Sequence, residues 1–169
     1  MAQWELTVDD IMAILPETPL RIAALTDDLT AAQLRTPPGP DAWSINDVLA
    51  HLRACHDVLG GSVLRIVTED HPAWRGVNPR SWIRKTDYPE WEFARAFTAF
   101  KAQRAQLLSV VEPLPPDAWE RTATVTGMVG ETYERTARYF GAWMAGHERA
   151  HWKHIQRLAD EARAGANAG

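Results

Sequence analysis

Apolar residues recur at intervals of three and four along most of this 169-residue chain, which is the spacing of an amphipathic helix. The clearest example follows Ser44, which together with Asp47 three residues later fits a helix capping box. The apolar stripe of this segment comprises Ile45, Leu49, Leu52, Leu59, Val63 and Ile66. The pattern predicts a helix from Ser44 to about Thr68 with one buried face.

A first helix is predicted to begin at Thr7, whose spacing to Asp10 fits a second capping box. Pro16 and Pro19 lie inside this segment, and proline lacks the N–H that the interior of a helix needs. We therefore expect a two-piece helix that is broken or kinked at the prolines and resumes over residues 20–29.

Two more helices are predicted in the second half of the chain. Pro89 suits the first turn of a helix whose apolar positions continue to Val111, before the breaker sequence EPLPPDAW. The last helix is predicted from about Glu131 to Arg163, roughly 33 residues or about 50 Å at the usual rise per residue.

The connections between these helices are long. Residues 35–43 have the composition of a loop, and residues 71–88 show no clear period and are expected to form an ordered crossover. Runs that alternate apolar and polar residues are scarce, which favours helices over sheets. The prediction is an all-α, four-helix bundle with long crossover connections, a single domain over residues 1–169 with a flexible tail at about 164–169.

Composition and charge narrow the classes of function. The 22 Asp and Glu outnumber the 18 Lys and Arg, and the net charge of −4 argues against nucleic acid or a membrane surface as a partner. No apolar run approaches the roughly 20 residues of a spanning helix, and the acidic start MAQWELTVDD is unlike a signal peptide, so a cytoplasmic location is expected. With Cys55 as the single cysteine, a metal site would depend on histidine and carboxylate.

Three histidines occupy the apolar seam of the last predicted helix. The seam comprises Tyr133, Ala137, Phe140, Met144, His147, His151, His154 and Leu158. Buried imidazoles need partners for both ring nitrogens, and the nearby sequence supplies few acceptors. A divalent metal would resolve this conflict, because residues four apart, such as His147 and His151, project side by side from one helix face. The second predicted helix offers His51, Cys55 and His56 for a further ligand.

Several of these candidates also have structural interpretations. His154 is a ligand, an outer-shell donor or a packing residue, and Cys55 is a ligand, a nucleophile or an inert buried thiol. Arg104 lies on the seam of the third helix, where it either snorkels to solvent or meets an anionic substrate group. Glu148 is a candidate base, or else a solvated or salt-bridged carboxylate. The tryptophans are interpreted as core and loop anchors.

Residues 147–151, HERAH, also fit the H-E-x-x-H pattern of zinc peptidases, in which the glutamate activates water. Gluzincins need a further acidic ligand on a following helix, and too little chain follows His151 for one. Metzincins need Gly and His three and six residues after the second histidine, where this chain has His154 and Arg157. A metallopeptidase is therefore only a remote alternative.

Two segments, PGPDAWSINDVLAHLRACH at residues 38–56 and GHERAHWKHIQRL at residues 146–158, resemble the DinB/YfiT-like superfamily. The likeness covers nearly the whole chain. Members of that superfamily are four-helix bundles in which one histidine of a W-S-I-x-x-V-L-x-H-L helix and an H-x-x-x-H pair on the last helix bind a divalent metal. The resemblance implies that His51, His147 and His151 are the metal ligands in this chain.

The resemblance also bears on the residues around these ligands. It places His56 and His154 near the metal, as residues that line the pocket or form part of the outer shell. Cys55, on the same predicted helix as His51, is a further candidate for the outer shell. Ala54 stands where some relatives have Asp, so a carboxylate near the site is missing here. A homodimer is a further expectation from the family.

The resemblance implies chemistry as well as a site. Relatives include thiol-dependent transferases and a maleylpyruvate isomerase, and three histidine ligands leave an open position on the metal for water or a substrate thiol. We expect a metal-dependent enzyme, a thiol S-transferase or hydrolase, that acts on a small-molecule substrate. Its cofactor would be zinc, nickel or iron, with a low-molecular-weight thiol as a candidate cosubstrate. The alternative is a noncatalytic bundle that the metal staples together and that binds a small ligand or a protein.

Overall fold

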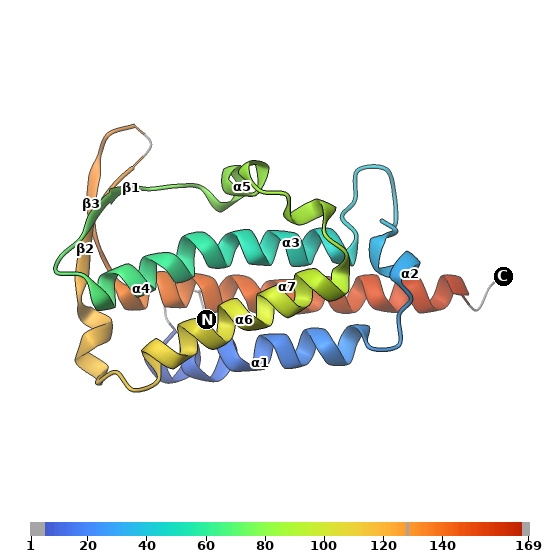
Figure 1. Cartoon of the computed structure of the whole chain (residues 1–169), viewed down its shortest axis with the longest axis horizontal. Helices are drawn as coiled ribbons and strands as arrows, with labels where there is room; N and C mark the ends of the chain where they lie inside the picture. The colour runs from blue at the N-terminus through green and yellow to red at the C-terminus, as the bar shows by residue number, and fades with distance from the viewer. Residues whose placement is uncertain (1–5, 128, 167–169) are drawn as a thin grey trace.

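Four long helical rods form the body of the molecule (Figure 1). The computed structural model describes residues 6–127 and 129–166. The rods are α1 (Val8–Thr26), α3 (Ile45–Cys55) continued by α4 (Gly61–Thr68), α6 (Phe93–Val111) and α7 (Ala137–Ala166). α7 packs against α1, α3 and α4, while α6 crosses the bundle obliquely. This arrangement confirms the prediction of a four-helix bundle with long crossover connections.

Helix α1 is continuous through Pro16 and Pro19, so the predicted two-piece helix is wrong. Pro19 has no N–H to donate to the carbonyl of Leu15, four residues earlier. That carbonyl instead accepts a hydrogen bond of 2.5 Å from the Arg104 guanidinium on α6. The helix continues past the proline because the side chain of another helix satisfies the acceptor that the proline leaves unpaired.

Capping boxes start α1 and α3 where the sequence predicts them. The hydroxyls of Thr7 and Ser44 each accept from the backbone N–H three residues later, and the carboxylate at that position accepts from the capping residue in return. A third box, at Thr30, starts the short helix α2 (Ala31–Arg35), which the sequence analysis does not predict. These boxes satisfy N–H groups that have no partner inside their helices.

A π turn, His56–Gly60, separates α3 from α4, where the sequence predicts one regular helix. His51 and His56, one before the turn and one at its start, are both buried, at 4% and 5% exposed. His56 packs edge-on against Phe100 of α6, while His51 contacts the histidines of α7. A Cβ added to Gly60 would lie 3.2 Å from His56 Nε2, so a glycine here gives the buried ring its space.

The crossover after α4 runs along α3 and contains β1 (Ala73–Arg75), α5 (Pro79–Trp82) and a 3-10 turn, Ile83–Lys85 (Figure 1). Asp57 of the π turn ties it down, because its carboxylate accepts from Trp82 Nε1 at 3.1 Å and from the Tyr88 hydroxyl at 2.8 Å. The ordered crossover predicted for residues 71–88 is thus present, although its elements are not evident from the sequence.

Helix α6 begins at Phe93, later than the predicted start at Pro89. Pro89 lies in a 3-10 turn, Tyr88–Glu90, and the backbone of Trp91 after it is extended, with ψ at 142°. The Asn46 side chain donates to the Trp91 carbonyl at 3.1 Å, which holds this part of the chain against α3. Because Trp91 is extended and bound to Asn46, α6 begins only after it, at Phe93.

A three-stranded sheet covers one end of the bundle and is not predicted from the sequence (Figure 1). β2 (Thr122–Thr126) pairs antiparallel with β3 (Thr132–Thr136), and β1 pairs in parallel with β2. Helix α7 therefore starts at Ala137 instead of about Glu131, and Tyr133 is not on its seam. Thr and Tyr favour strands, and pairing with β2 overrides the apolar spacing that predicts helix for β3.

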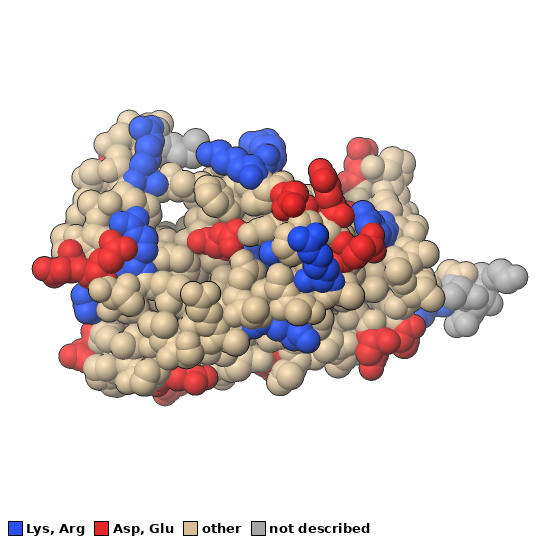
Figure 2. Space-filling view, in the orientation of Figure 1, with Lys and Arg blue, Asp and Glu red and all other residues tan. Residues whose placement is uncertain are grey.

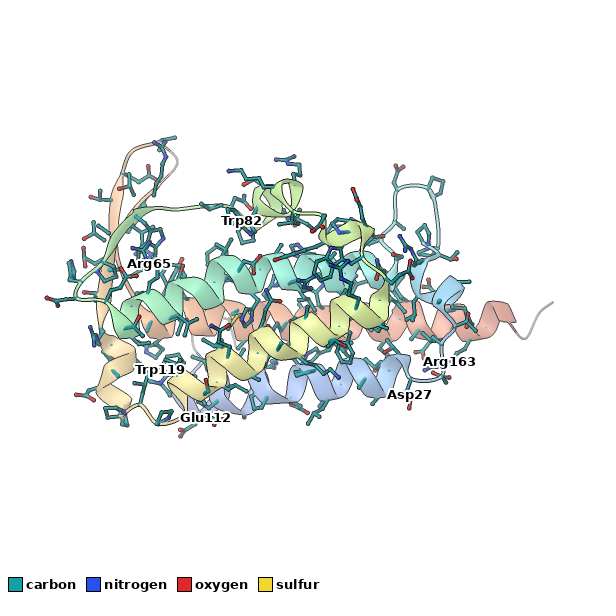
Figure 3. The ribbon with its side chains drawn as sticks, viewed as in Figure 1. Asp27, Arg65, Trp82, Glu112, Trp119 and Arg163 are labelled. Carbon is teal, nitrogen blue, oxygen red and sulfur yellow. The ribbon has the colours of Figure 1, made fainter. Side chains whose placement is uncertain are left out.

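The first part of α7 packs against a short 3-10 helix, and its last part runs to the end of the described chain. In the short 3-10 helix Pro116–Glu120, Trp119, labelled in Figure 3, is 2% exposed. Its ring lies so close to α7 that a Cβ added to Gly141 would be 2.8 Å from it. Residues 164–166 continue α7, so the predicted tail is helical over that part, and residues 167–169 lie outside the described residues. Among the helices of the described chain, none is both long and apolar enough to cross a membrane.

Candidate metal site

Three imidazoles from two helices converge between α3 and α7. His51 comes from α3, and His147 and His151 lie one turn apart on the same face of α7. His147 Nε2 lies 3.2 Å from His51 Nε2 and 3.3 Å from His151 Nε2. Each residue offers one ligand atom, and these atoms all lie within 4.8 Å of one another. The structure thus brings together the three residues that the sequence resemblance implies.

Hydrogen bonding among the rings does not account for this geometry. One ring nitrogen carries either a proton or a lone pair, so His147 Nε2 cannot make two good hydrogen bonds at once. Three nitrogens around one tetrahedral zinc ion, at 2.0 to 2.1 Å each, would lie about 3.3 Å apart. The observed separations of 3.2 and 3.3 Å match that spacing, so these residues fit a bound divalent cation.

Burial keeps the three imidazoles neutral. It lowers the pKa of His51 to about 4 and that of His151 to about 3, with further contributions from the neighbouring His147 and from Arg80. Burial also lowers the pKa of His147, against the charge of Glu148. Neutral imidazole is the form that binds metal, so the ligands are ready at pH 7 without losing protons.

Trp43, in the loop before the Ser44 cap, packs against the histidines and is 41% exposed. Its ring centroid lies 5.0 Å from that of His51 and 6.5 Å from that of His151, and it is nearly parallel to the His151 ring, at 7°. The sequence analysis does not identify this residue as part of the site. Its place directly before the Ser44 cap, eight residues ahead of His51, is the signal that was available.

The remaining candidates lie around the three histidines. Cys55 Sγ is 3.5 Å from His51 Nε2, and burial, with the charge of Glu148, raises its pKa to about 12, so it is a thiol at pH 7. His154 stacks on His151 at a centroid distance of 5.8 Å, and His56 faces α6. Within the described chain, none of the three joins the group of converging ligand atoms.

Arg104 and Glu148 form a buried ion pair with each side chain 2% exposed. Arg104 Nη1 lies 3.0 Å from Glu148 Oε2, and its Nη2 donates to the other carboxylate oxygen. Thr18 also donates to Glu148 Oε2, at 2.6 Å, and accepts from Trp152 Nε1 at 3.2 Å. Arg104 therefore neither snorkels nor faces the bundle mouth, and Glu148 is salt-bridged and not free as a base. Thr18 is a member of this network that sequence spacing does not reveal.

The fold and the site together define a class, a four-helix bundle in which three histidines from two helices converge as a group that could hold a metal ion. Residues 15–155 match the family model of the DinB superfamily, and the chain belongs to this superfamily. Among functionally curated proteins, none matches this sequence.

A solved structure is similar over most of its length. YfiT from Bacillus subtilis, described as "a probable metal-dependent hydrolase with an unusual four-helix bundle topology", superposes with a TM-score of 0.71 at 19% sequence identity. The match covers 90% of this chain and 86% of YfiT. At this identity the likeness establishes the shared fold.

Proposed function

We propose that this protein is a divalent-metal-dependent enzyme, a hydrolase or a thiol S-transferase, with His51, His147 and His151 as the metal ligands. The observation that carries the proposal is the convergence of three neutral imidazoles from α3 and α7. Membership of the DinB superfamily and the fold shared with YfiT, described as a probable metal-dependent hydrolase, support it.

Zinc, nickel and iron are the candidate metals, because imidazole suits all three. A divalent ion held there would supply Lewis-acid chemistry and lower the pKa of a water or a thiol. The protein's own part is to hold three ligands in place and to leave room for a small substrate. A low-molecular-weight thiol remains a candidate cosubstrate, and a homodimer remains a candidate assembly.

The alternative is a noncatalytic bundle in which the metal only staples α3 to α7. A staple would close the metal's coordination with a fourth protein ligand. Cys55, His56 and His154 are the nearest candidates, and none of them belongs to the group of converging ligand atoms in the described chain. A bound metal without a fourth protein ligand would have a position free for water or substrate, which supports a reactive site.

The H-E-x-x-H peptidase alternative receives no support from the geometry. That mechanism needs the glutamate after the first histidine as a free base beside the metal. Here Glu148 is 1% exposed and hydrogen-bonded to Arg104 and Thr18, so its carboxylate is neutralised and occupied.

The proposal is tested by zinc and nickel titration calorimetry on the wild type and on His51→Ala, His147→Ala and His151→Ala. Loss of a ligand is expected to weaken metal binding at least tenfold in each variant, because three ligands share one ion. His71→Ala is the matched control, since His71 is an exposed histidine beside Thr124 of the sheet. Metal affinity unchanged in the three variants would remove the proposed site.

Activity is assayed separately, with ester substrates for hydrolysis and with an electrophile plus a low-molecular-weight thiol for transfer. Turnover that requires metal and is lost in His147→Ala supports an enzyme. Tight metal binding without turnover of either substrate class would favour the staple.

A further inference from the structure

The crossover after α4 encloses a hollow that is separate from the three-histidine cluster. The hollow has a volume of about 410 Å³, with Gly61 and Arg65 of α4 on one side and Trp74 and Trp82 of the crossover on the other. Figure 1 shows the crossover passing above α4, and Figure 2 shows the surface hollowed beneath it. A hollow of this size is large enough for a small molecule.

The walls of the hollow are mainly apolar, which is typical of small-molecule sites. The apolar side chains that line it are Val58, Leu64, Trp74, Val77 and Trp82. The face of an indole ring attracts cations. The Arg65 guanidinium lies 4.7 Å from the centre of the Trp74 ring, and the Lys85 ammonium lies 5.8 Å from that of Trp82. The walls therefore suit an apolar ligand that carries a positive charge.

Asp57 of the π turn adds a carboxylate to this lining. Its Oδ2 accepts from Trp82 Nε1 at 3.1 Å and from the Tyr88 hydroxyl at 2.8 Å, and its Oδ1 accepts from Gln103 Nε2 at 2.6 Å. All three donors are neutral, and among the described residues Asp57 makes no ion pair. A carboxylate has roughly four acceptor positions, so one remains for a ligand.

The arginines near Asp57 are held by other groups. The Arg53 guanidinium lies 3.7 Å from the centre of the Tyr88 ring. Arg65 borders the hollow, but its Nε and Nη2 donate to the two carboxylate oxygens of Glu69, at 2.9 and 3.0 Å. In the described part of the chain, Asp57 is therefore the charge of the lining that lacks an ion-pair partner.

We propose that this hollow binds a small organic cation, a primary ammonium attached to an aromatic group. The ammonium donates to Asp57, and the aromatic group lies against Trp74 and Trp82. The hydrogen bonds of Asp57 keep its carboxylate in place before a ligand arrives, which lowers the entropy cost of binding. The assignment does not depend on the proposed function, because the hollow and the metal ligands share no described residue.

Phenethylammonium is a suitable probe, and 2-phenylethanol is its neutral counterpart. Each is titrated by calorimetry at pH 7 into the full chain, with and without zinc. Phenethylammonium should bind about tenfold more tightly than 2-phenylethanol, the usual effect of a charge-assisted hydrogen bond. Asp57→Asn should weaken phenethylammonium about tenfold and change 2-phenylethanol less than about twofold, because only the cation uses the charge.

Gly61→Phe tests the hollow without changing Asp57. Gly61 lines the hollow, and a Cβ added there meets nothing within 4 Å, so a larger side chain has room to fill it. This variant should weaken both probes about tenfold or more, because a phenyl group would occupy the volume that the ligand needs. Asp57 also holds the crossover, so Gly61→Phe decides the matter if Asp57→Asn fails to fold.

Asp70→Asn is the matched control for the change of charge. Asp70 is exposed, directly precedes the crossover and does not line the hollow. Its loss should alter the affinity for phenethylammonium less than about twofold, because solvent and salt screen exposed charges. Thermal midpoints equal to that of the wild type show that the variants are folded.

Three results would overturn the assignment. Phenethylammonium could fail to bind at millimolar concentration, it could bind equally to folded Asp57→Asn and Asp70→Asn, or it could bind to folded Gly61→Phe as it does to the wild type. Equal affinity with and without zinc is the expected result. Binding that requires zinc would place the cation at the three histidines, and it would overturn the assignment as well.

Discussion

His56 shows how burial sets the charge of a single side chain outside the three proposed metal ligands. It is 5% exposed, packs against Phe100 and lies against Gly60. Its Nδ1 has no hydrogen-bond partner among the described residues. Burial, together with the positive charge of Arg104, lowers the pKa of His56 to about 3. The folded protein therefore holds this imidazole in its neutral form.

The metal-free protein is predicted to lose stability as the pH falls below 6.5. The unfolded chain protonates His56 near its usual pKa of 6.5, while the folded chain resists protonation down to about pH 3, so acid favours unfolding over this range. His51 and His151 act in the same direction. Urea unfolding in EDTA at pH 7 and pH 5 should show a loss of about 1 to 3 kcal/mol for His56 alone.

His56→Met tests the contribution of this residue, because methionine fills a similar volume and does not titrate. The variant should lose less stability than the wild type between pH 7 and pH 5. His71→Met is the control, since His71 is exposed in contact with Thr122 and Thr124. The same loss in His56→Met as in the wild type would mean that His56 does not carry the effect.

At the scale of elements, α7 depends on one glycine where it meets the 3-10 helix Pro116–Glu120. A Cβ added to Gly141 would lie 2.8 Å from the Trp119 ring and 3.4 Å from Ile11. We predict that Gly141→Ala destabilises the protein by about 1 to 3 kcal/mol through overpacking, although alanine favours helix more than glycine does. The measurement is the free energy of unfolding in urea.

Gly61→Ala is the matched control for this change. Gly61 also lies in a helix, α4, but an added Cβ there meets nothing within 4 Å. That variant should be as stable as the wild type or more stable, by up to about 1 kcal/mol. If the two variants changed stability equally, the contact with Trp119 would not be the reason for glycine at 141.

The helices were predictable where local signals suffice. Thr7 and Ser44 start helices as the capping boxes predict, because such a box involves residues only three apart. β3 was not predictable, because its stability depends on pairing with β2 and not on its own spacing. The continuity of α1 through Pro19 depends likewise on Arg104, 85 residues away by number, whose contact with Leu15 exists only in the folded chain.

The residues of the candidate site also fall into those that local patterns predict and those that they do not. His147 and His151 were predictable from the residues, because a spacing of four on an apolar seam is a local pattern. The choice of His51 over Cys55 and His56 needed the family resemblance, since three candidates share its helix. The ion pair between Arg104 and Glu148 was not predictable, because it depends on how α6 and α7 are rotated relative to each other, which no local pattern gives.

At the scale of the whole molecule, one buried polar network connects three of the four rods. Arg104 of α6 contacts Glu148 of α7 and the Leu15 carbonyl of α1, and Thr18 of α1 donates to Glu148. Glu148 directly follows His147 in the chain. The network therefore fixes the turn of α7 that carries a proposed metal ligand, and its loss should be felt both in stability and in metal binding.

Arg104→Met is predicted to destabilise the protein by about 3 to 5 kcal/mol in urea unfolding, because it leaves the Glu148 carboxylate buried without its counter-charge. The Leu15 carbonyl also loses its partner. The double variant Arg104→Met/Glu148→Leu should recover part of this loss, because no buried charge then remains. A change in zinc affinity should accompany the single variant, since His147 lies next to the unpaired carboxylate.

A surface ion pair on α7 serves as the comparison for the destabilisation expected of Arg104→Met. Arg157 and Glu161 pair at 2.8 Å with side chains 57% and 45% exposed, so Arg157→Met should cost at most about 1 kcal/mol. If Arg104→Met cost no more than Arg157→Met, the buried pair would not connect the rods as described. If the double variant were less stable than Arg104→Met, removing the unpaired carboxylate would bring no relief, and the buried charge would not be the cause of the destabilisation.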